Sequence, residues 1–356
     1  MPKYGRLGAS SRVRMLQYLP WLRQAEIEVT FQALLPSREL AQRYRLGRYS
    51  WRALLVAYGN RLRALLVRRQ YDLLWIEKEA LPWMPVWLER CLLQGVPYVL
   101  DYDDAVFHHY DAHSNPLVRV IYGRRIDTLM AGAELVVAGN NYLALRAKQS
   151  GAKKVEVVPT VVDVNKYRPK TDVLGEIARN LSSAIESPRI VWIGAPATVK
   201  YLDLLKVPLE KLATYRRFTF RIVGGRPVDM PGVNVEYVDW AEDTEAATVG
   251  ECDIGVMPLL DSPWERGKCG YKLVQYMACG LPVVASNIGV NPEIVLDRQS
   301  GFLVNSESDW ETYLDRLLCD KALRIKMGRT GLKRVERFYS VQTTGPQMAD
   351  LLRAML

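Results

Sequence analysis

The chain has 356 residues, more than one hydrophobic core usually serves, so its length predicts two domains. Hydrophobic residues make up 49% and charged residues 24%, a globular composition that excludes disordered and fibrous proteins. Five scattered cysteines argue for a reducing cytoplasm rather than a disulfide framework, and the formal net charge of +9 calls for an anionic partner or surface.

The first predicted element is a helix that begins at Ser10 or Ser11, either of which can cap it, and runs through Leu22. The next is a strand from Glu26 to Leu34. A sheet of alternating strands and helices ordinarily begins with a strand, but only Met1 to Leu7 precede the helix. Either the first strand lies upstream of Met1 or the sheet begins with its second strand, and the sequence leaves both readings open.

An arginine-rich segment without acidic residues follows, over residues 40–71. Tryptophan, tyrosine and leucine recur in it at helical spacing, as in a helix that lies on anionic headgroups. A core-facing helix with a solvated basic face fits the pattern equally well. The chain shows no signal-peptide pattern and no apolar run of about 20 residues, so we expect a cytoplasmic protein, with residues 40–71 as a candidate contact to an anionic membrane surface. The segment carries Arg43, Arg45, Arg48, Arg52, Arg61, Arg63, Arg68 and Arg69.

Charged residues follow two of the next predicted strands. Glu77 and Lys78 end the strand at 73–77, and the strand at 98–100 runs into Asp101, Asp103 and Asp104. Because carboxyl ends of parallel strands share one sheet edge, we expect these residues near a ligand. They could equally be a solvated charge run or helix caps. Two more strands, at 135–138 and 155–158, complete the first half.

All three histidines of the chain lie just beyond these aspartates. Aspartate and histidine together can hold a divalent ion, but no second ligand cluster accompanies them, so we predict no metal. Surface loop residues are the alternative interpretation. The histidines are His108, His109 and His113.

The second half repeats the alternation, with strands at 189–193, 219–223, 233–237, 253–257, 282–285 and 301–304. A polar, proline-containing stretch separates the halves. We therefore predict an α/β protein with two Rossmann-like domains that face each other across a cleft. The N-terminal domain covers 1–165, with 336–356 packing back on it; the linker is 166–187, and the C-terminal domain is 188–335.

The segment 251–294 has the densest group of residues that could bind a ligand. Gly267 and Gly270 allow a tight turn, and the helix that follows offers free amides and a positive dipole end to a diphosphate. Lys268 and Lys272 lie four residues apart, so we place both on one face of the helix start, where they can neutralise a departing nucleoside diphosphate. Gln275 follows at the next helical spacing and could bond a ribose hydroxyl.

QYMACGLPVVASNIGVNPEI, from Gln275 to Ile294, resembles the donor-binding region of the family 4 retaining glycosyltransferases, group 1 enzymes of the GT-B fold. The sequence departs from the family pattern at two positions, because the family's paired glutamates align with Gly267 and Gln275. The form GKCGYK, which begins at Gly267, looks like that of one branch of the family. Glu265, two residues before Gly267, could take the place of the first glutamate. We favour the other interpretation, in which the backbone amides of Gly289, Val290 and Asn291 contact the donor sugar.

The resemblance extends to VWIGAPATVKYL, where Gly194 fits the first turn of the nucleotide domain and Lys200 the diphosphate-binding cation. By the same analogy, Gly8 lies near the donor phosphate and Arg12 toward the acceptor. Lys200 could also be a plain solvated residue.

Within this family the charged residues of the first half acquire expected roles. Asp103 or Asp104 would orient the acceptor hydroxyl, and His108 or His109 would line the donor sugar. Glu77 and Lys78 would be further acceptor contacts.

The resulting prediction is a glycosyltransferase that uses a nucleoside diphosphate sugar, UDP or GDP based, with neither metal nor cofactor. Retention of configuration is implied by the resemblance alone. A lipid-linked saccharide at the inner membrane face is the expected acceptor, in bacterial surface polysaccharide or glycolipid synthesis, and no nucleic-acid partner is expected. The alternatives are a nucleotide-sugar epimerase of the same fold and a non-catalytic nucleotide-binding partner subunit.

Overall fold

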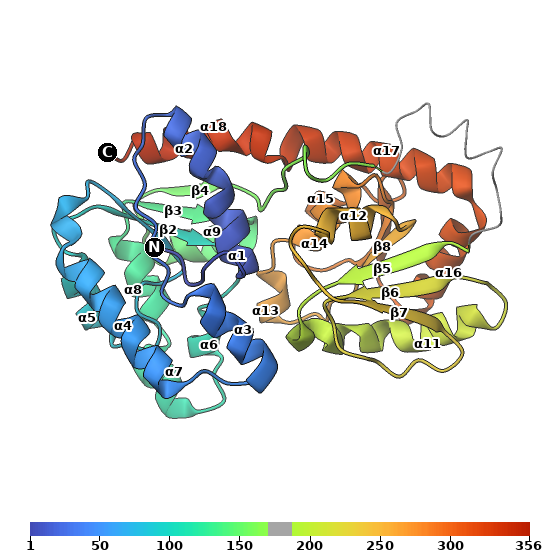
Figure 1. Cartoon of the computed structure of the whole chain (residues 1–356), viewed down its shortest axis with the longest axis horizontal. Helices are drawn as coiled ribbons and strands as arrows, with labels where there is room; N and C mark the ends of the chain where they lie inside the picture. Colours follow the sequence, from blue (N-terminus) through green and yellow to red (C-terminus); the bar gives the residue numbers. More distant parts are fainter. Residues whose placement is uncertain (170–186) are drawn as a thin grey trace. The chain divides into compact units, whose positions relative to one another are not determined.

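The structure, a computed structural model, describes residues 1–169 and 187–356. Its contacts divide it into two compact units (Figure 1). Unit 1 comprises Met1–Thr160, Ser262–Cys269 and Val341–Leu356, and unit 2 comprises Val161–Asp261 and Gly270–Ser340. The sequence placed Ser262–Cys269 in the C-terminal domain, whereas this segment packs within unit 1. Residues 170–186 of the predicted linker lie outside the described residues.

Unit 1 is built on a parallel sheet in the order β1-β2-β3-β4. Its strands are runs of apolar residues, and β2 and β3 are buried along their whole length, as expected of a parallel sheet covered on both faces. The four predicted strands from residue 73 onward are confirmed, with β1 in register with β2 from Leu74 opposite Tyr98. The strands are β1 (Leu74–Glu77), β2 (Tyr98–Tyr102), β3 (Leu135–Ala138) and β4 (Val155–Val157).

The predicted strand at 26–34 is wrong. Three backbone hydrogen bonds join its end to the N-terminal residues: the Leu34 N–H donates to the Pro2 carbonyl, the Leu35 N–H to the Lys3 carbonyl and the Gly5 N–H to the Leu35 carbonyl. Those residues bond in turn to β1, through the Glu77 N–H and the Met1 carbonyl. Residues 1–5 thus lie where a first strand would lie, but Pro2 lacks a donor, and the guanidinium of buried Arg61 bonds the Pro2 carbonyl at 2.7 Å.

The first helix, α1 (Ala9–Arg14), begins after Gly8, and neither serine caps it. The Ser11 hydroxyl instead donates to Glu77 Oε2 at 2.5 Å, because α1 packs against the end of β1. The C-terminal helix α18 also belongs to unit 1, where Tyr18 Oη lies 3.1 Å from Thr344 Oγ1. The other helices of unit 1 are η1 (Leu16–Tyr18), α2 (Leu19–Gln24), α3 (Ser37–Leu46), α4 (Trp51–Leu66), η2 (Arg68–Gln70), α5 (Val86–Leu93), α6 (His108–Asp111), α7 (Pro116–Tyr122), α8 (Arg125–Gly132), α9 (Asn141–Gln149), α13 (Pro263–Arg266) and α18 (Val341–Arg353).

Unit 2 is built on a six-stranded parallel sheet in the order β10-β9-β8-β5-β6-β7, the doubly wound arrangement. All six predicted strands are confirmed to within a residue or two. The order reverses between β5 and β8, and ligands of such sheets bind beyond the carboxyl ends of the strands at that point. The strands are β5 (Arg189–Ile193), β6 (Thr219–Val223), β7 (Asn234–Val238), β8 (Ile254–Met257), β9 (Val283–Ser286) and β10 (Gly301–Val304).

Helices cover both faces of this sheet. Alternate residues of β5 enter different cores: Ile190 and Trp192 pack with α11 and α16, and Val191 and Ile193 pack with α12 and α14. Among the described residues of both units, no helix is long and apolar enough to cross a membrane. The helices of unit 2 are η3 (Pro196–Leu202), α11 (Asp203–Ala213), α12 (Glu245–Gly250), α14 (Tyr271–Ala278), α15 (Asn291–Ile294), α16 (Glu307–Cys319) and α17 (Lys321–Phe338).

Candidate active site

A charged cluster occupies the carboxyl edge of the unit 1 sheet. Lys78 follows β1 in a left-handed conformation with φ of 65°, and its N–H bonds the Asp101 carbonyl at 2.9 Å. Its ammonium lies 2.8 Å from Asp103 Oδ1 and 3.4 Å from Asp104 Oδ2, and it donates to Ser10 Oγ at 3.3 Å. The structure therefore brings together Lys78, Asp103 and Asp104, which the sequence placed on two separate strand ends.

Lys78 and Asp103 remain charged at neutral pH. Burial alone would lower the pKa of Lys78, but Asp103 and Asp104 outweigh it and raise that pKa well above its ordinary value. Burial alone would raise the pKa of Asp103, yet the Lys78 charge and hydrogen bonds from Lys78 and Ser10 lower it. Neither residue can exchange a proton near pH 7, so their chemistry is electrostatic. Asp104, with its side chain 28% exposed, is the carboxylate that a substrate can reach.

The segment Ser262–Cys269 brings a second lysine to this cluster. Asn140, the N-cap of α9, donates from Nδ2 to the carbonyls of Gly267 and Lys268, both at 3.0 Å. A Cβ on Gly267 would stand 2.3 Å from Ala105 Cβ, so only glycine allows this approach. As a result, Lys268 Nζ lies 3.8 Å from Asp104 Oδ1.

This geometry corrects the predicted pairing of Lys268 with Lys272. The helix α14 begins at Tyr271, after Gly270 with φ of 64°, so Lys268 is not on it. The positive φ breaks the helical spacing on which the prediction rested, and Lys268 and Lys272 belong to different units.

The histidines diverge. His108 uses both ring nitrogens inside unit 1, at 2.7 Å from Asp111 Oδ1 and 2.8 Å from Tyr142 Oη. His109 instead lies against Trp264, with ring centroids 4.4 Å apart and the rings tilted by 36°, and burial, Lys3 and Lys78 lower the pKa of His109. Across residues 1–169 and 187–356, no group of three His, Cys, Asp or Glu side chains could hold a metal ion.

Three further predicted residues of unit 1 have structural contacts. Glu77 is buried and accepts the Lys3 N–H at 2.8 Å as well as the Ser11 hydroxyl. Gly8 precedes α1, and a Cβ there would lie 2.4 Å from Tyr4 Cβ. Arg12 is buried on α1. The hydrogen bonds to Glu77 hold the N-terminal residues against β1.

A buried ion pair lies beneath the cluster, and no pattern in the sequence predicted it. Arg14 Nε lies 2.7 Å from Asp101 Oδ1, and both side chains are fully buried. The Arg14 guanidinium also donates to the Val158 carbonyl at 2.8 Å, so it ties α1 to the ends of β2 and β4. Asn140 and Trp264 were missed as well, because each reaches the cluster only through tertiary contacts.

In unit 2, the edge near the sheet's order reversal is formed mainly by backbone. Gly194 follows β5 and bonds from its N–H to the Val223 carbonyl at 3.0 Å, and a Cβ there would stand 2.5 Å from the Trp192 ring. Lys272, in the first turn of α14, holds its ammonium 4.7 Å from the Trp192 ring centroid. Lys200 is exposed on η3, with its ammonium 5.1 Å from the Tyr201 ring.

The start of α14 is packed closely against α15. A Cβ on Gly270 would lie 2.2 Å from Ile294 Cδ1 and 3.1 Å from Val290 Cγ1. Asn291 is fully buried and donates to the Ser286 carbonyl at 2.9 Å, while its Oδ1 has no hydrogen-bond partner among the described residues. The glycine therefore fixes α15 beside the free amides of α14.

Gln275 lies inside unit 2 rather than at its surface. Its Nε2 donates to Tyr167 Oη at 2.8 Å and to Glu245 Oε1 at 2.9 Å. Trp240 Nε1 also donates to Glu245. Gln275 thus belongs to a buried polar network whose carboxylate comes from α12, which the sequence analysis did not single out.

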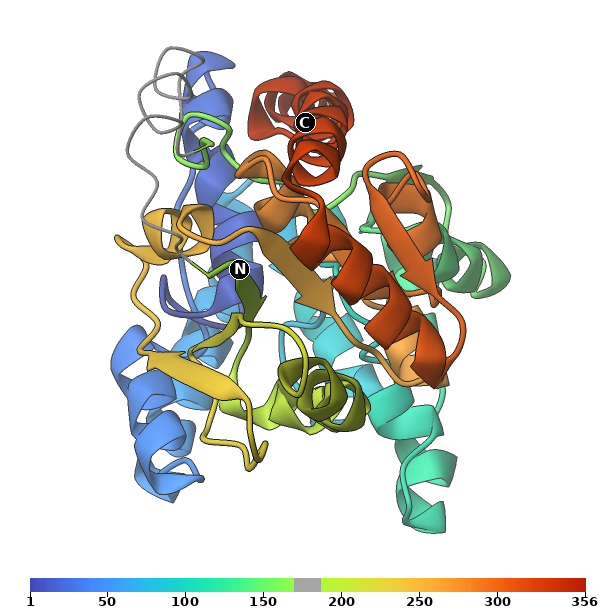
Figure 2. The same ribbon diagram turned by 90° about the vertical axis from the view of Figure 1, so that its right-hand side faces the viewer.

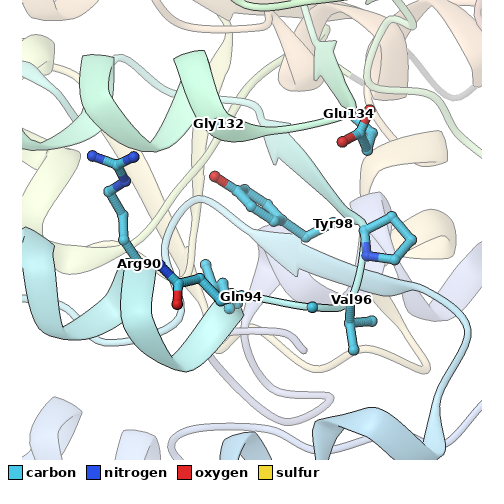
Figure 3. A pocket seen from close by; sticks show the side chains of 9 residues that line it. Arg90, Gln94, Val96, Tyr98, Gly132 and Glu134 are labelled. Carbon is cyan, nitrogen blue, oxygen red and sulfur yellow. The ribbon is translucent and has the colours of Figure 1, made fainter.

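A separate pocket of about 370 Å³ opens at the other edge of the unit 1 sheet (Figure 3). Arg90, Gln94, Tyr98 and Glu134 line it, at the amino ends of β2 and β3. Because the charged cluster lies at the carboxyl ends of the same strands, the pocket is no part of it.

Residues 187–320 match the family model described as "Glycosyl transferases group 1". The sulfoquinovosyl transferase SQD2 of Arabidopsis thaliana is 26% identical over 58% of this chain and 40% of its own length. A protein of the Klebsiella pneumoniae cps region is 32% identical over 34% of each chain. The chain therefore spans less than half of these two relatives. A GDP-mannose-dependent phosphatidylinositol monomannoside mannosyltransferase of Mycobacterium tuberculosis is 26% identical over 82% of this chain and 78% of its own.

Solved structures share the fold. Sucrose-phosphate synthase of Thermosynechococcus elongatus aligns with a TM-score of 0.66 at 17% identity, over 86% of this chain and 80% of its own. HepE of Anabaena, in complex with UDP, aligns with a TM-score of 0.63 at 17% identity, over 83% and 82%. The chain thus has the GT-B fold, and its residues 187–320 carry the pattern of the group 1 glycosyl transferases.

Proposed function

We propose that the chain transfers a sugar from a nucleoside diphosphate sugar to an acceptor hydroxyl. The observation that carries the proposal is the start of α14: within the segment that matches the group 1 family, Gly270 opens a helix at the carboxyl edge of the sheet, with Lys272 in its first turn. Free amides and a positive dipole end suit a diphosphate, and the lysine adds a mobile cation. UDP or GDP is the expected base, and HepE was solved with UDP and with UDP-glucose.

Unit 1 supplies the acceptor side of the reaction in this proposal. Asp104 accepts the hydrogen bond of the attacking hydroxyl, and Lys78 and Lys268 hold Asp104 in place from either side. Because the Lys78 charge lowers the pKa of Asp103, Asp103 stays anionic and cannot act as an acid near pH 7.

The bond changes follow from the chemistry of the donor. The anomeric carbon–oxygen bond to the diphosphate breaks, and its electron pair leaves with the diphosphate. The acceptor oxygen forms the new bond, and its proton passes to the leaving phosphate. We infer retention of configuration from the family resemblance. Neutralisation of the leaving group by Lys272 and the α14 dipole supports a reaction without a metal ion.

We further propose a lipid-linked saccharide acceptor at the inner face of the cytoplasmic membrane, in surface polysaccharide or glycolipid synthesis. The basic segment 40–71 supports this choice. It covers most of α3, the turn that follows and α4; Arg61 is buried, whereas Arg45, Arg48 and Arg52 are exposed. The mycobacterial relative is by its name a mannosyltransferase acting on a phosphatidylinositol monomannoside.

The test is release of nucleoside diphosphate from a panel of UDP and GDP sugars, with EDTA, with and without an extract of bacterial lipids. Release that requires the extract, and a labelled sugar that moves into the lipid fraction, supports the proposal. Conversion of the donor without an acceptor would favour an epimerase or hydrolase. Binding of a nucleotide without any turnover would favour a non-catalytic subunit.

A further inference from the structure

Helix α7 exposes an apolar surface that the sequence analysis did not single out. None of its residues is buried, and Leu117, Val120 and Ile121 are 67%, 82% and 64% exposed. Single exposed apolar residues are ordinary, but a contiguous set on one short helix marks a contact surface. The surrounding charges are basic: Arg119 lies on the helix and Arg124 just after it.

This helix is held firmly in place. Asn115 caps it by accepting the Leu117 N–H at 2.9 Å, and Pro116 occupies the first turn. Arg119 folds back to donate to the His113 carbonyl at 2.7 Å. At its base, Trp83 meets the Tyr122 ring edge to face at 6.1 Å between centroids. The apolar side chains are therefore presented by an ordered element.

The turn between α3 and α4 presents a second surface of the same kind. Leu46, Trp51 and Leu55 are 62%, 65% and 64% exposed. Arg45, Arg48 and Arg52 lie among them, and within the described ranges none of the three pairs with a carboxylate. In Figures 1 and 2 this turn and α7 both lie at the lower margin, and Figure 2 shows them at opposite sides of it, as two separate points of contact for one flat surface.

We propose that α7 and the α3–α4 turn form one docking face for an anionic lipid bilayer. The apolar side chains enter the headgroup region, and the arginines bind lipid phosphates. The inference rests on the proposed function, in which the acceptor is lipid-linked, and adds α7 to it. A second copy of this chain fits the face poorly, because it would bring the same arginines together.

The test uses the full chain and sedimentation with vesicles of phosphatidylcholine alone or with phosphatidylglycerol, which contain no acceptor. We expect binding only to the anionic vesicles, and we expect V120D/I121D to weaken it at least about tenfold. Replacement of Arg45, Arg48 and Arg52 by glutamine should remove most of the dependence of vesicle binding on salt concentration. V207D is the matched control, because Val207 is 57% exposed on α11 of unit 2, and it should bind as the native chain does.

Three results would overturn the inference: no binding to anionic vesicles, native binding by V120D/I121D, or an equal loss in V207D. Analytical ultracentrifugation without vesicles shows whether a second copy of the chain, rather than a bilayer, binds this face. Dissociation of a dimer by V120D/I121D would assign the face to a second copy. Transfer to a detergent-dispersed acceptor, measured on the same variants, stays unchanged if only docking is affected. The proposed function and this inference can therefore fail independently.

Discussion

The carboxyl edges of the two sheets differ in the groups that they offer to a substrate. In unit 1 the edge is made of side-chain charge: Lys78 and Lys268 flank Asp104, and Asp103 is paired with Lys78. In unit 2 it is made of backbone, with Gly194 and Gly270 opening turns and Lys272 beside the start of α14. The first edge fixes charged groups in place, and the second leaves amides available to an anion.

The segment with the strongest family pattern therefore does not contain all of the candidate site residues. Residues 187–320 carry the match, but Lys268, which falls inside it, packs with the carboxylates of unit 1. Acceptor chemistry and nucleotide binding should therefore respond separately to substitutions at the two edges.

Among the variants, K78M should lose the most transfer activity. It leaves Asp103 and Asp104 without their buried cation, and loss of one partner of such a pair costs about 3–5 kcal/mol of stability. We expect sugar transfer to fall at least about 100-fold, a typical loss for one electrostatic group. K78R is the matched control and should retain more activity. Turnover and thermal unfolding of both variants check this, and a K78M enzyme with native turnover would contradict it.

At the second edge, K272A should weaken the affinity for the nucleoside diphosphate about tenfold, the value of one charge-assisted hydrogen bond. Lys200 provides the comparison, because it is exposed on η3. K200A should therefore have the smaller effect. Calorimetric titration measures both, and equal losses would remove the distinction between the two lysines.

The segment that carries Lys268 is tested by G267A. The new Cβ would stand 2.3 Å from Ala105 Cβ and 3.0 Å from the Ala105 nitrogen, so the segment must move and Lys268 with it. We expect kcat to fall by about threefold to tenfold, of the order expected for a small misplacement of a charged group. Nucleotide affinity should change less, and a loss confined to affinity would argue against this placement of Lys268.

The smallest effect concerns pH. Because Lys78 lowers the pKa of Asp103 below its unfolded value, Asp103 contributes stability that is complete above about pH 4 and is lost as the pH falls through the lowered pKa. The difference in unfolding temperature between the native chain and D103N should therefore narrow from pH 6 toward pH 3, by a few degrees. Scanning calorimetry at several pH values measures it, and a constant difference would show that Asp103 is not paired in solution.

The fold and part of the candidate site could be predicted from the sequence. Apolar runs correctly predicted ten strands. The carboxyl ends of parallel strands meet at one edge of the sheet, so the charged residues there, Lys78, Asp103 and Asp104, could be predicted as site residues. Residues 26–34 were predicted as a strand because polar and β-branched or aromatic residues alternate there, but this pattern does not show whether a partner strand offers enough donors.

The missed residues depend on contacts between distant segments. The sequence pattern indicates only a helix cap at Asn140, whereas in the structure its Nδ2 also donates to the carbonyls of Gly267 and Lys268. Helical spacing placed Lys268 beside Lys272, and only the positive φ of Gly270 separates them. His108 and His109 are adjacent in sequence, yet they face different partners, Tyr142 and Trp264.

The most direct test of the central claim compares K272A with K268A in one calorimetric titration with nucleoside diphosphate and EDTA, alongside a transfer assay. We expect both variants to transfer sugar poorly, but only K272A to lose nucleotide affinity. If K268A loses nucleotide affinity as strongly as K272A, both lysines bind the nucleotide. The assignment of the acceptor to the unit 1 edge and of the nucleotide to the unit 2 edge is then wrong.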